Sequence, residues 1–158
     1  SYGRADLEGA FARAHIRILE DVSQLAYVGK DATPVRIVGR KDWLYTQGNR
    51  FTPAQLMPNG PDNVYTILLD HEPRELKADA AAGANLILSG HTHGGQIWPF
   101  HHLVGIDKPA LAGLSHHGAR TLLYTSRGTD FWGPPFRVFA PSEITLLVLR
   151  SPHPATAP

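Results

Sequence analysis

The pattern of hydrophobic and polar positions contains two short apolar runs that each lead to histidine. Residues 64–69 form the first run and are followed by His71, and residues 86–89 form the second run and are followed by His91 and His93. Short continuous apolar runs are typical of strands that are buried on both faces of a sheet. The pattern therefore predicts two buried strands whose carboxyl ends carry imidazoles.

The segment between the two runs predicts a helix over residues 74–82. Pro73 presets the first turn, alanines fill much of the segment, and Gly83 supplies a left-handed stop. A strand, a helix and a second strand within about thirty residues form a right-handed crossover, which makes the two strands parallel. Because parallel strands end at the same edge of a sheet, we expect the three histidines to converge at that edge.

Weaker patterns predict further elements. Residues 24–29 and 35–40 alternate apolar and polar positions around a turn, which indicates a hairpin. A single turn of helix is expected at residues 52–56, with proline in its first helical position. Two more strands are expected at residues 121–126 and 143–150.

The two ends of the chain differ in character. Residues 6–20 predict a helix that Asp6 caps. Its apolar positions recur at helical spacing and predict one stripe that packs into the core: Leu7, Phe11, Ala14 and Ile18. Residues 151–158 are rich in proline and alanine and are expected to form a disordered tail.

Composition narrows the classes of function. The chain has 158 residues, and its 15 basic and 14 acidic residues give a net charge of +1. The scattered charges leave no electrostatic footprint for nucleic acid, and every apolar run is shorter than the roughly twenty residues of a membrane span. The absence of cysteine excludes a disulfide scaffold and a thiolate metal site, so any metal must be held by histidine and carboxylate.

The three histidines after the apolar runs are the candidate metal ligands. Imidazole is the commonest metal ligand in proteins, and the bound ions activate water and neutralise phosphate charge. Glycines around His91 and His93 permit tight turns that aim short side chains inward. The alternative is that these histidines and His71 are solvated loop residues. Asp70 or Glu72 could accept a hydrogen bond from an imidazole and so hold it in one tautomer. The alternative is that these carboxylates are charges that face the solvent.

Three further residues are candidates for contact with a substrate. Gln96 closely follows the glycines, Arg127 follows a strand and carries a guanidinium suited to phosphate, and Trp98 belongs to an aromatic segment. The aromatic segments at residues 97–100 and 130–139 are expected to wall a substrate pocket or to contact a membrane interface. Structural packing is the alternative for each of them.

Two more histidine pairs follow no predicted strand. We expect the pairs at residues 101–102 and 116–117 to lie in surface loops rather than to bind metal.

Several segments of the chain resemble one known family: residues 67–73, 86–98, 123–128 and 141–146. Together with the string Gly-His-Thr-His-Gly-Gly-Gln at residues 90–96, they look like the second half of a calcineurin-like metallophosphoesterase of the bacterial branch similar to YaeI and YkuE. The resemblance implies an α/β fold that is part of a four-layer αββα sandwich with mixed sheets. Residues 1–150 would be the C-terminal portion of that domain and contribute strands to both sheets.

The resemblance also implies a centre of two divalent metal ions, manganese, iron or zinc, bridged by a carboxylate. His71 and His91 would bind one ion and His93 the other. The family's earlier segments, an Asp-x-His, a Gly-Asp and a Gly-Asn-His, do not occur in this chain. The bridging aspartate and the histidine that assists the leaving group are therefore missing, which leaves the catalytic residues unknown. We expect the isolated chain to be weakly active or inactive.

Two functions of different classes follow. In the first, the parent protein is a hydrolase, a phosphoesterase that cleaves a phosphodiester or pyrophosphate. The resemblance suggests a nucleotide-linked lipid or envelope precursor as substrate and a bacterial membrane surface as location. In the second, the chain is a non-catalytic binding or assembly domain with a vestigial metal site, whose uncovered sheet surface favours self-association.

Overall fold

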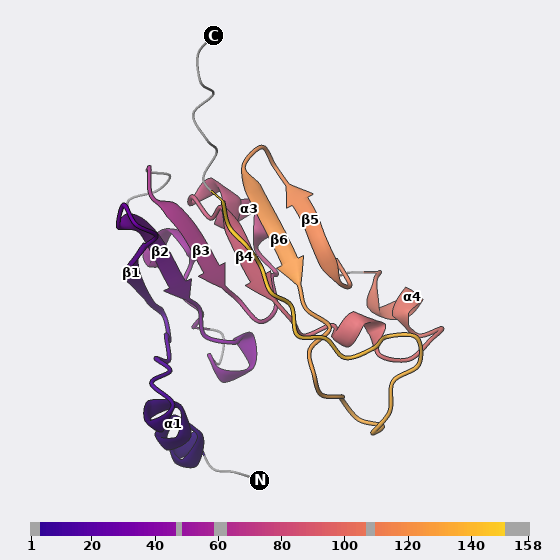
Figure 1. Ribbon diagram of the computed structural model, residues 1–158. Coiled ribbons are helices and arrows are strands. Elements are labelled where there is room, and N and C mark those ends of the chain that lie inside the picture. The colour runs from indigo at the N-terminus through magenta and orange to yellow at the C-terminus, as the bar shows by residue number, and fades with distance from the viewer. Residues whose placement is uncertain (1–3, 47–48, 59–62, 107–109, 151–158) are drawn as a thin grey trace.

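A six-stranded mixed sheet forms the centre of the computed structural model, which describes residues 4–46, 49–58, 63–106 and 110–150 (Figure 1). The strands are β1 (Val22–Val28), β2 (Thr33–Gly39), β3 (Tyr65–Leu69), β4 (Leu86–Ser89), β5 (Gly113–His117) and β6 (Thr121–Thr125). Their spatial order is β1-β2-β3-β4-β6-β5. The four inner strands are parallel, and β1 and β5 pair antiparallel at the two edges.

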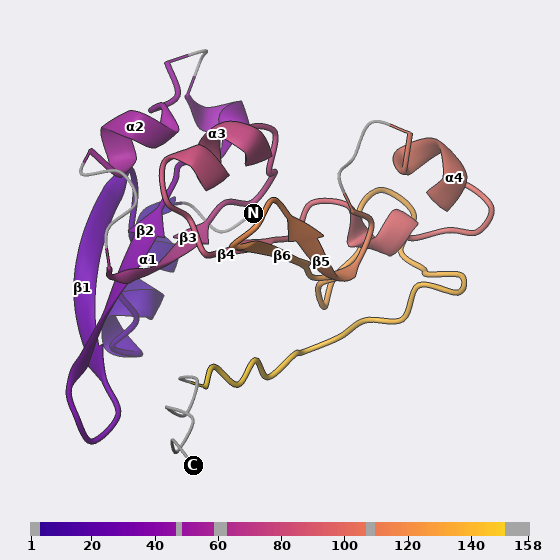
Figure 2. The same ribbon diagram turned by 90° about the horizontal axis from the view of Figure 1, so that it is seen from above.

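The helices of the described residues are short. They are α1 (Arg4–Arg13), α2 (Pro53–Leu56), α3 (Leu76–Ala81) and α4 (His101–Val104), with single 3-10 turns η1 (Trp43–Tyr45) and η2 (His93–Gly95). Figure 2 shows α2 and α3 on one side of the sheet, while the chain that follows β6 returns on the other side. In the described structure, α2 and α3 cover one face of the sheet, and the segment that follows β6 crosses the other face.

The hydrophobic core lies between the sheet and the helices that cover it. Val38, Leu68, Ile87 and Leu123 are neighbours in register on the four parallel strands, and each is 0% exposed. Leu56 and Met57, from the end of α2, and Ala84 pack against this row. Burying one such large aliphatic side chain contributes about 1.5–3 kcal/mol, so this row holds the parallel strands in register.

The predicted strand–helix–strand unit is confirmed. Strands β3 and β4 are parallel, with α3 between them in sequence. The predicted hairpin is confirmed as β1 and β2, and the predicted helical turn is α2, where Thr52 and Gln55 form a capping box. The α/β fold class is confirmed, and the mixed sheet is consistent with part of a metallophosphoesterase sandwich.

The expectation of a strand at residues 143–150, and of strands in two sheets, is wrong for the described residues. All described strands belong to one sheet, and residues 143–150 form an extended segment without strand pairing. Ile144 and Leu146 on this segment are 92% and 86% exposed. A strand needs a neighbour for its backbone hydrogen bonds, and this apolar segment has none beside it in the described structure.

The N-terminal helix is shorter than predicted. It ends at Arg13 rather than at residue 20, because His15 adopts a left-handed φ of 55° and the next N–H, that of Ile16, bonds back to the carbonyl of Phe11. The side chains of the predicted apolar stripe are exposed: Leu7 to 48%, Phe11 to 39% and Ile18 to 43%, and Ala14 is exposed as well. The prediction that this stripe packs into the core is therefore wrong. Asp6 lies inside the first turn and is not the cap.

The histidine pairs are in regular structure rather than in loops. The pair at residues 116–117 belongs to the edge strand β5, which the sequence analysis missed, and the pair at residues 101–102 begins α4. The predicted tail, residues 151–158, lies outside the described residues.

Candidate functional site

The loops that follow β3 and β4 lie side by side at one edge of the sheet. Parallel pairing continues past both strands, because the N–H of Asp70 bonds to the carbonyl of Leu88 and the N–H of Gly90 bonds to the carbonyl of His71. The rings of His71 and His91 meet edge to face with their centroids 5.4 Å apart. The structure thus brings together histidines that lie about twenty residues apart in sequence, as expected for a right-handed crossover.

His71, His91 and His93 all line one cavity of about 660 Å³, which we call the histidine cavity. Its remaining lining comes from η1, from residues 92–97 around η2, from residues 100–104 at α4 and from the aromatic loop, residues 130–139: Leu44, Thr92, Gly95, Gln96, Ile97, Phe100, Val104, Trp132 and Pro134. The volume lies within the range of about 300–1,000 Å³ that is usual for small-molecule sites.

The backbone of this loop is unusually contorted. His91, His93 and Gln96 have left-handed φ values of 68°, 51° and 50°, and the two glycines between His93 and Gln96 are left-handed as well. A non-glycine residue in this region costs on the order of 1–3 kcal/mol and persists only where the surroundings enforce it. Such strain is typical of functional sites.

The two glycines of the loop are also needed sterically. A Cβ on Gly95 would lie 2.3 Å from the Cβ of His101, so α4 rests directly on this backbone. A Cβ on Gly94 would lie 2.9 Å from the Cγ of Arg127, whose aliphatic stem packs against this backbone. The glycines therefore permit close packing around the histidines, in addition to the tight turn that the sequence predicts.

Each of the three imidazoles has an oxygen atom nearby. The Nε2 atom of His91 lies 3.4 Å from Oε1 of Glu72, whose side chain is 6% exposed. The Nε2 atom of His71 lies 3.9 Å from Oδ2 of Asp42, and Nδ1 of His93 lies 3.3 Å from the carbonyl of Asp130. An oxygen within hydrogen-bond distance orients a metal-binding imidazole, whereas the 3.9 Å between His71 and Asp42 is longer than a hydrogen bond.

Of the two carboxylates suggested by the sequence, Glu72 lies beside an imidazole and Asp70 does not. Asp42 was missed, although it follows β2, another parallel strand that ends at this edge. The strand order was the signal that could have found it.

Asp70 belongs instead to a buried network of charges on the helix-covered side of the sheet. The guanidinium of Arg40 donates to Asp70, to both oxygens of Asp79 at 2.8 Å, and to Glu75 at 3.2 Å, while Arg50 also pairs with Asp70. The side chains of Arg40, Asp70 and Asp79 are 0% exposed. Burial raises the pKa of Asp79 to about 6, although Arg40 opposes the shift. This network fixes the end of β3, and with it the start of the loop that carries His71, to α3.

The side chain of Gln96 binds the aromatic loop. Its Nε2 donates to the carbonyl of Trp132 at 2.7 Å and of Pro134 at 3.2 Å, and its Oε1 accepts from the N–H of Trp132 at 2.6 Å. Gln96 is 7% exposed. These contacts favour the packing alternative for Gln96, and a direct role in substrate binding stays a prediction.

Arg127 and Trp98, the other candidate substrate contacts, lie outside the lining of the histidine cavity. The guanidinium of Arg127 pairs with Glu143 at 3.3 Å, and the pKa of Glu143 is lowered chiefly because the N–H of Arg127 donates to it. Trp98 is 55% exposed and packs edge to face on Phe139. Their substrate roles also stay predictions.

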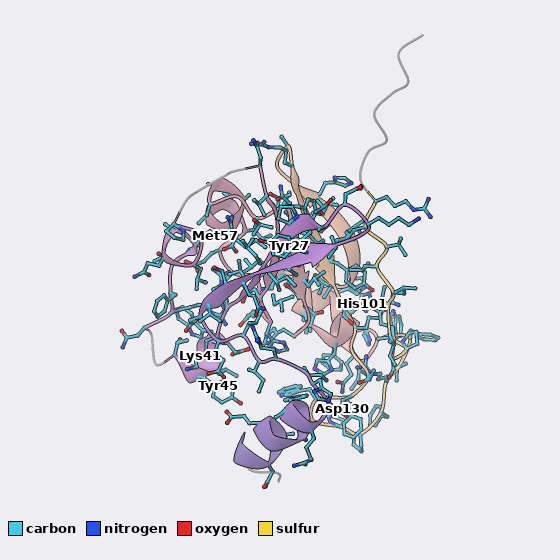
Figure 3. The ribbon with its side chains drawn as sticks, turned by 60° about the vertical axis from the view of Figure 1, so that its left-hand side comes forward. Tyr27, Lys41, Tyr45, Met57, His101 and Asp130 are labelled. Atoms are coloured by element: carbon cyan, nitrogen blue, oxygen red, sulfur yellow. The ribbon has the colours of Figure 1, made fainter. Side chains whose placement is uncertain are left out.

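Arg137 was missed by the sequence analysis and ties the aromatic loop to His93. Its guanidinium donates to the carbonyls of His93 at 3.1 Å, Arg127 at 2.9 Å and Ala140 at 3.2 Å, and also to that of Asp130. In Figure 3, the labelled His101 and Asp130 lie on the same side of the molecule, away from Met57. Residues of α4 and of the aromatic loop both line the histidine cavity.

The residues present fit a metal site in kind and fall short of it in number. Neutral imidazoles suit zinc, iron and manganese, and the cavity gathers three of them. Among the described residues, however, no three His, Cys, Asp or Glu side chains are close enough to hold an ion together.

Comparison with curated proteins shows that the chain is similar to proteins named metallophosphoesterases. The chain is 49% identical over 85 residues to the uncharacterized metallophosphoesterase Cj0846 of Campylobacter jejuni, covering 54% of this chain and 23% of that protein. It is 38% identical over 94 residues to the uncharacterized metallophosphoesterase YkuE of Bacillus subtilis, covering 57% and 32%. A zebrafish (Danio rerio) transmembrane protein with metallophosphoesterase domain is 32% identical over 164 residues, covering 94% and 36%.

The chain spans between 23% and 36% of the length of these curated relatives. No family model matches it, and no solved structure matches it. Among the described helices, none combines the length and the apolar character needed to cross a membrane.

Proposed function

We propose that this chain supplies part of the metal centre, together with the loops that face the substrate, of a phosphoesterase that hydrolyses phosphodiester or pyrophosphate bonds. The observation that carries the proposal is the meeting of His71, His91 and His93 in one cavity at the carboxyl edge of parallel strands. Similarity to proteins named metallophosphoesterases supports the same chemistry.

The histidines would hold the metal through their ring nitrogens. Two divalent ions, manganese, iron or zinc, supply charge that binds phosphate and lowers the pKa of a water when they are bound. We assign His71 and His91 to one ion and His93 to the other. Glu72 would orient His91, and the carbonyl of Asp130 would orient His93. The other ligands would come from outside the described residues.

One observation favours a second candidate, a non-catalytic binding or assembly domain. The described residues contain no group of three donors that could hold an ion. The sheet also exposes apolar side chains on its less covered face, among them Leu69 and Leu114 at 37% and 58%. A surface of that kind favours self-association.

Hydrolysis of bis(p-nitrophenyl) phosphate by the purified chain, with manganese, iron or zinc added, separates the two candidates. The proposed function predicts that any hydrolysis by the chain is slow and requires metal. Loss of the ligand in His91→Ala should lower it at least about tenfold, the least that loss of a group orienting a ligand costs, while His116→Ala on the edge strand leaves it unchanged. Hydrolysis that needs no added metal, or metal-dependent hydrolysis that His91→Ala leaves unchanged, would contradict the proposed function. Dimer formation without metal, measured by light scattering, would then support the assembly domain.

A further inference from the structure

The guanidinium of Arg137 contacts His93 at two points. Its Nη1 donates to the backbone carbonyl of His93 at 3.1 Å, and its Nη2 lies 3.3 Å from Nδ1 of the His93 ring. Because a guanidinium is planar and rigid, these two contacts together restrict rotation of the ring. Arg137 therefore acts on the side chain of His93 as well as on its backbone.

Arg137 is itself held in place by other backbone groups. Its guanidinium donates to the carbonyl of Arg127 at 2.9 Å and to that of Ala140 at 3.2 Å, as well as to that of Asp130. A side chain bonded to so many carbonyls has little freedom to move. The His93 ring thus rests against a fixed support.

Nδ1 of His93 has a hydrogen-bond acceptor beside it as well as this donor. The carbonyl of Asp130 lies 3.3 Å from Nδ1 and also accepts from Nη2 of Arg137. A neutral imidazole carries its proton on one ring nitrogen and accepts at the other. Nδ1 can therefore donate to Asp130 in one tautomer and accept from Arg137 in the other, with the ring in the same orientation.

Among the described residues, no group bonds to the other ring nitrogen of His93, Nε2. His93 also lines the histidine cavity. An imidazole binds a metal through a nitrogen that carries no proton, so Nε2 is available when the proton is on Nδ1. In that tautomer Nδ1 donates to the carbonyl of Asp130.

We propose that Arg137 is a positioning residue that, with the carbonyl of Asp130, holds the His93 ring in one orientation in both tautomers and so keeps Nε2 available to a metal ion. Metal binding then requires the proton on Nδ1 but no rotation of the ring. The role toward metal rests on the proposed function, whereas the fixed ring is a property of the metal-free chain.

Nuclear magnetic resonance of the isotope-labelled chain at pH 8 tests the proposal. Before metal is added, carbon relaxation should show the His93 ring to be as ordered as the backbone of β4, and Arg137→Met should make the ring mobile. After zinc is added, the nitrogen chemical shifts should identify Nε2 as the bound nitrogen. Zinc affinity, measured by calorimetry, should fall about 10–100-fold in Arg137→Met. Arg120→Met, in the exposed turn between β5 and β6, should change neither ring order nor affinity.

The amide of Trp132 reports whether the aromatic loop stays folded in the variant. Its N–H donates to Oε1 of Gln96 at 2.6 Å and should exchange slowly with solvent in the native chain and in Arg137→Met. Loss of this protection in Arg137→Met would mean that Arg137 supports the loop as a whole, and it would overturn the positioning role. A ring that stays ordered in Arg137→Met, or zinc bound through Nδ1, would overturn it as well.

Failure of the proposed function gives a different result. If the native chain binds no zinc but its ring loses order in Arg137→Met, the metal centre is contradicted and the positioning of the ring is supported. If the ring becomes mobile in Arg137→Met and zinc affinity stays unchanged, the metal centre stands and the role of Arg137 toward metal is overturned.

Discussion

Replacing Arg40 with methionine tests the buried network that supports the histidine loop. Methionine keeps much of the apolar stem and removes the cation. In the native chain the guanidinium donates hydrogen bonds to Asp70, Asp79 and Glu75. After the change Asp70 keeps Arg50, while Asp79, which is 0% exposed, loses the cation that binds both of its oxygens.

The expected loss is large relative to the stability of a domain. Removing one partner of a buried ion pair typically costs about 3–5 kcal/mol, and a whole domain is stable by only about 5–15 kcal/mol. The loss should be smaller at pH 5 than at pH 8, because Asp79 already has its pKa raised to about 6 by burial and relieves the unpaired charge by taking up a proton.

Urea unfolding, followed by far-UV circular dichroism at both pH values, measures the effect. The control is Arg120→Met, in the exposed turn between β5 and β6, which should change the free energy of unfolding by less than about 0.5 kcal/mol. The double variant Arg40→Met with Asp79→Asn should be destabilised by less than the sum of the single variants. An Arg40→Met loss below about 1 kcal/mol, or a loss that grows toward pH 5, would refute this account of the network.

Two further predictions concern the same network and the histidine loop. The pKa of Asp79 is about 6 in the folded state, against an ordinary value of 3.8, so the folded state binds its proton more tightly than the unfolded state does. The stability that this protonated carboxyl contributes therefore falls as pH rises from about 4 to 6. The free energy of unfolding of the native chain minus that of Asp79→Asn should therefore decrease across this window and stay level above it, and an increase would reverse the assigned sign. Gly95→Ala should lower the thermal midpoint more than Gly128→Ala does, since both positions are left-handed but only a Cβ at Gly95 meets another residue, the Cβ of His101 at 2.3 Å. Equal shifts in calorimetry would contradict that packing.

The fold was predictable where local pattern and topology agree. Strands β3 and β4 are short apolar runs, and the crossover rule then requires them to be parallel and their histidines to converge. The prediction failed at β5 and at residues 143–150, because strand formation there depends on a neighbouring strand. The polar strand β5 has β6 beside it, whereas the apolar segment at 143–150 has no strand partner in the described structure.

The candidate site was predictable in its histidines but not in its supports. Arg40 bonds to Asp79, which lies 39 residues further along the chain, and Arg137 bonds to His93, which lies 44 residues before it. A local sequence pattern cannot predict contacts between residues so far apart in sequence. From the sequence alone, Gln96 is a candidate for contact with a substrate. Only the folded aromatic loop shows that its amide binds the backbone of Trp132.

The measurement that tests the central claim most directly is a calorimetric titration of the chain with zinc. If the histidines at the edge of the sheet act together as metal ligands, the chain binds zinc, and His91→Ala weakens the binding at least about tenfold while His116→Ala on β5 leaves it unchanged. Zinc binding that His91→Ala leaves unchanged, or no zinc binding at all, would contradict a metal centre at this edge of the sheet.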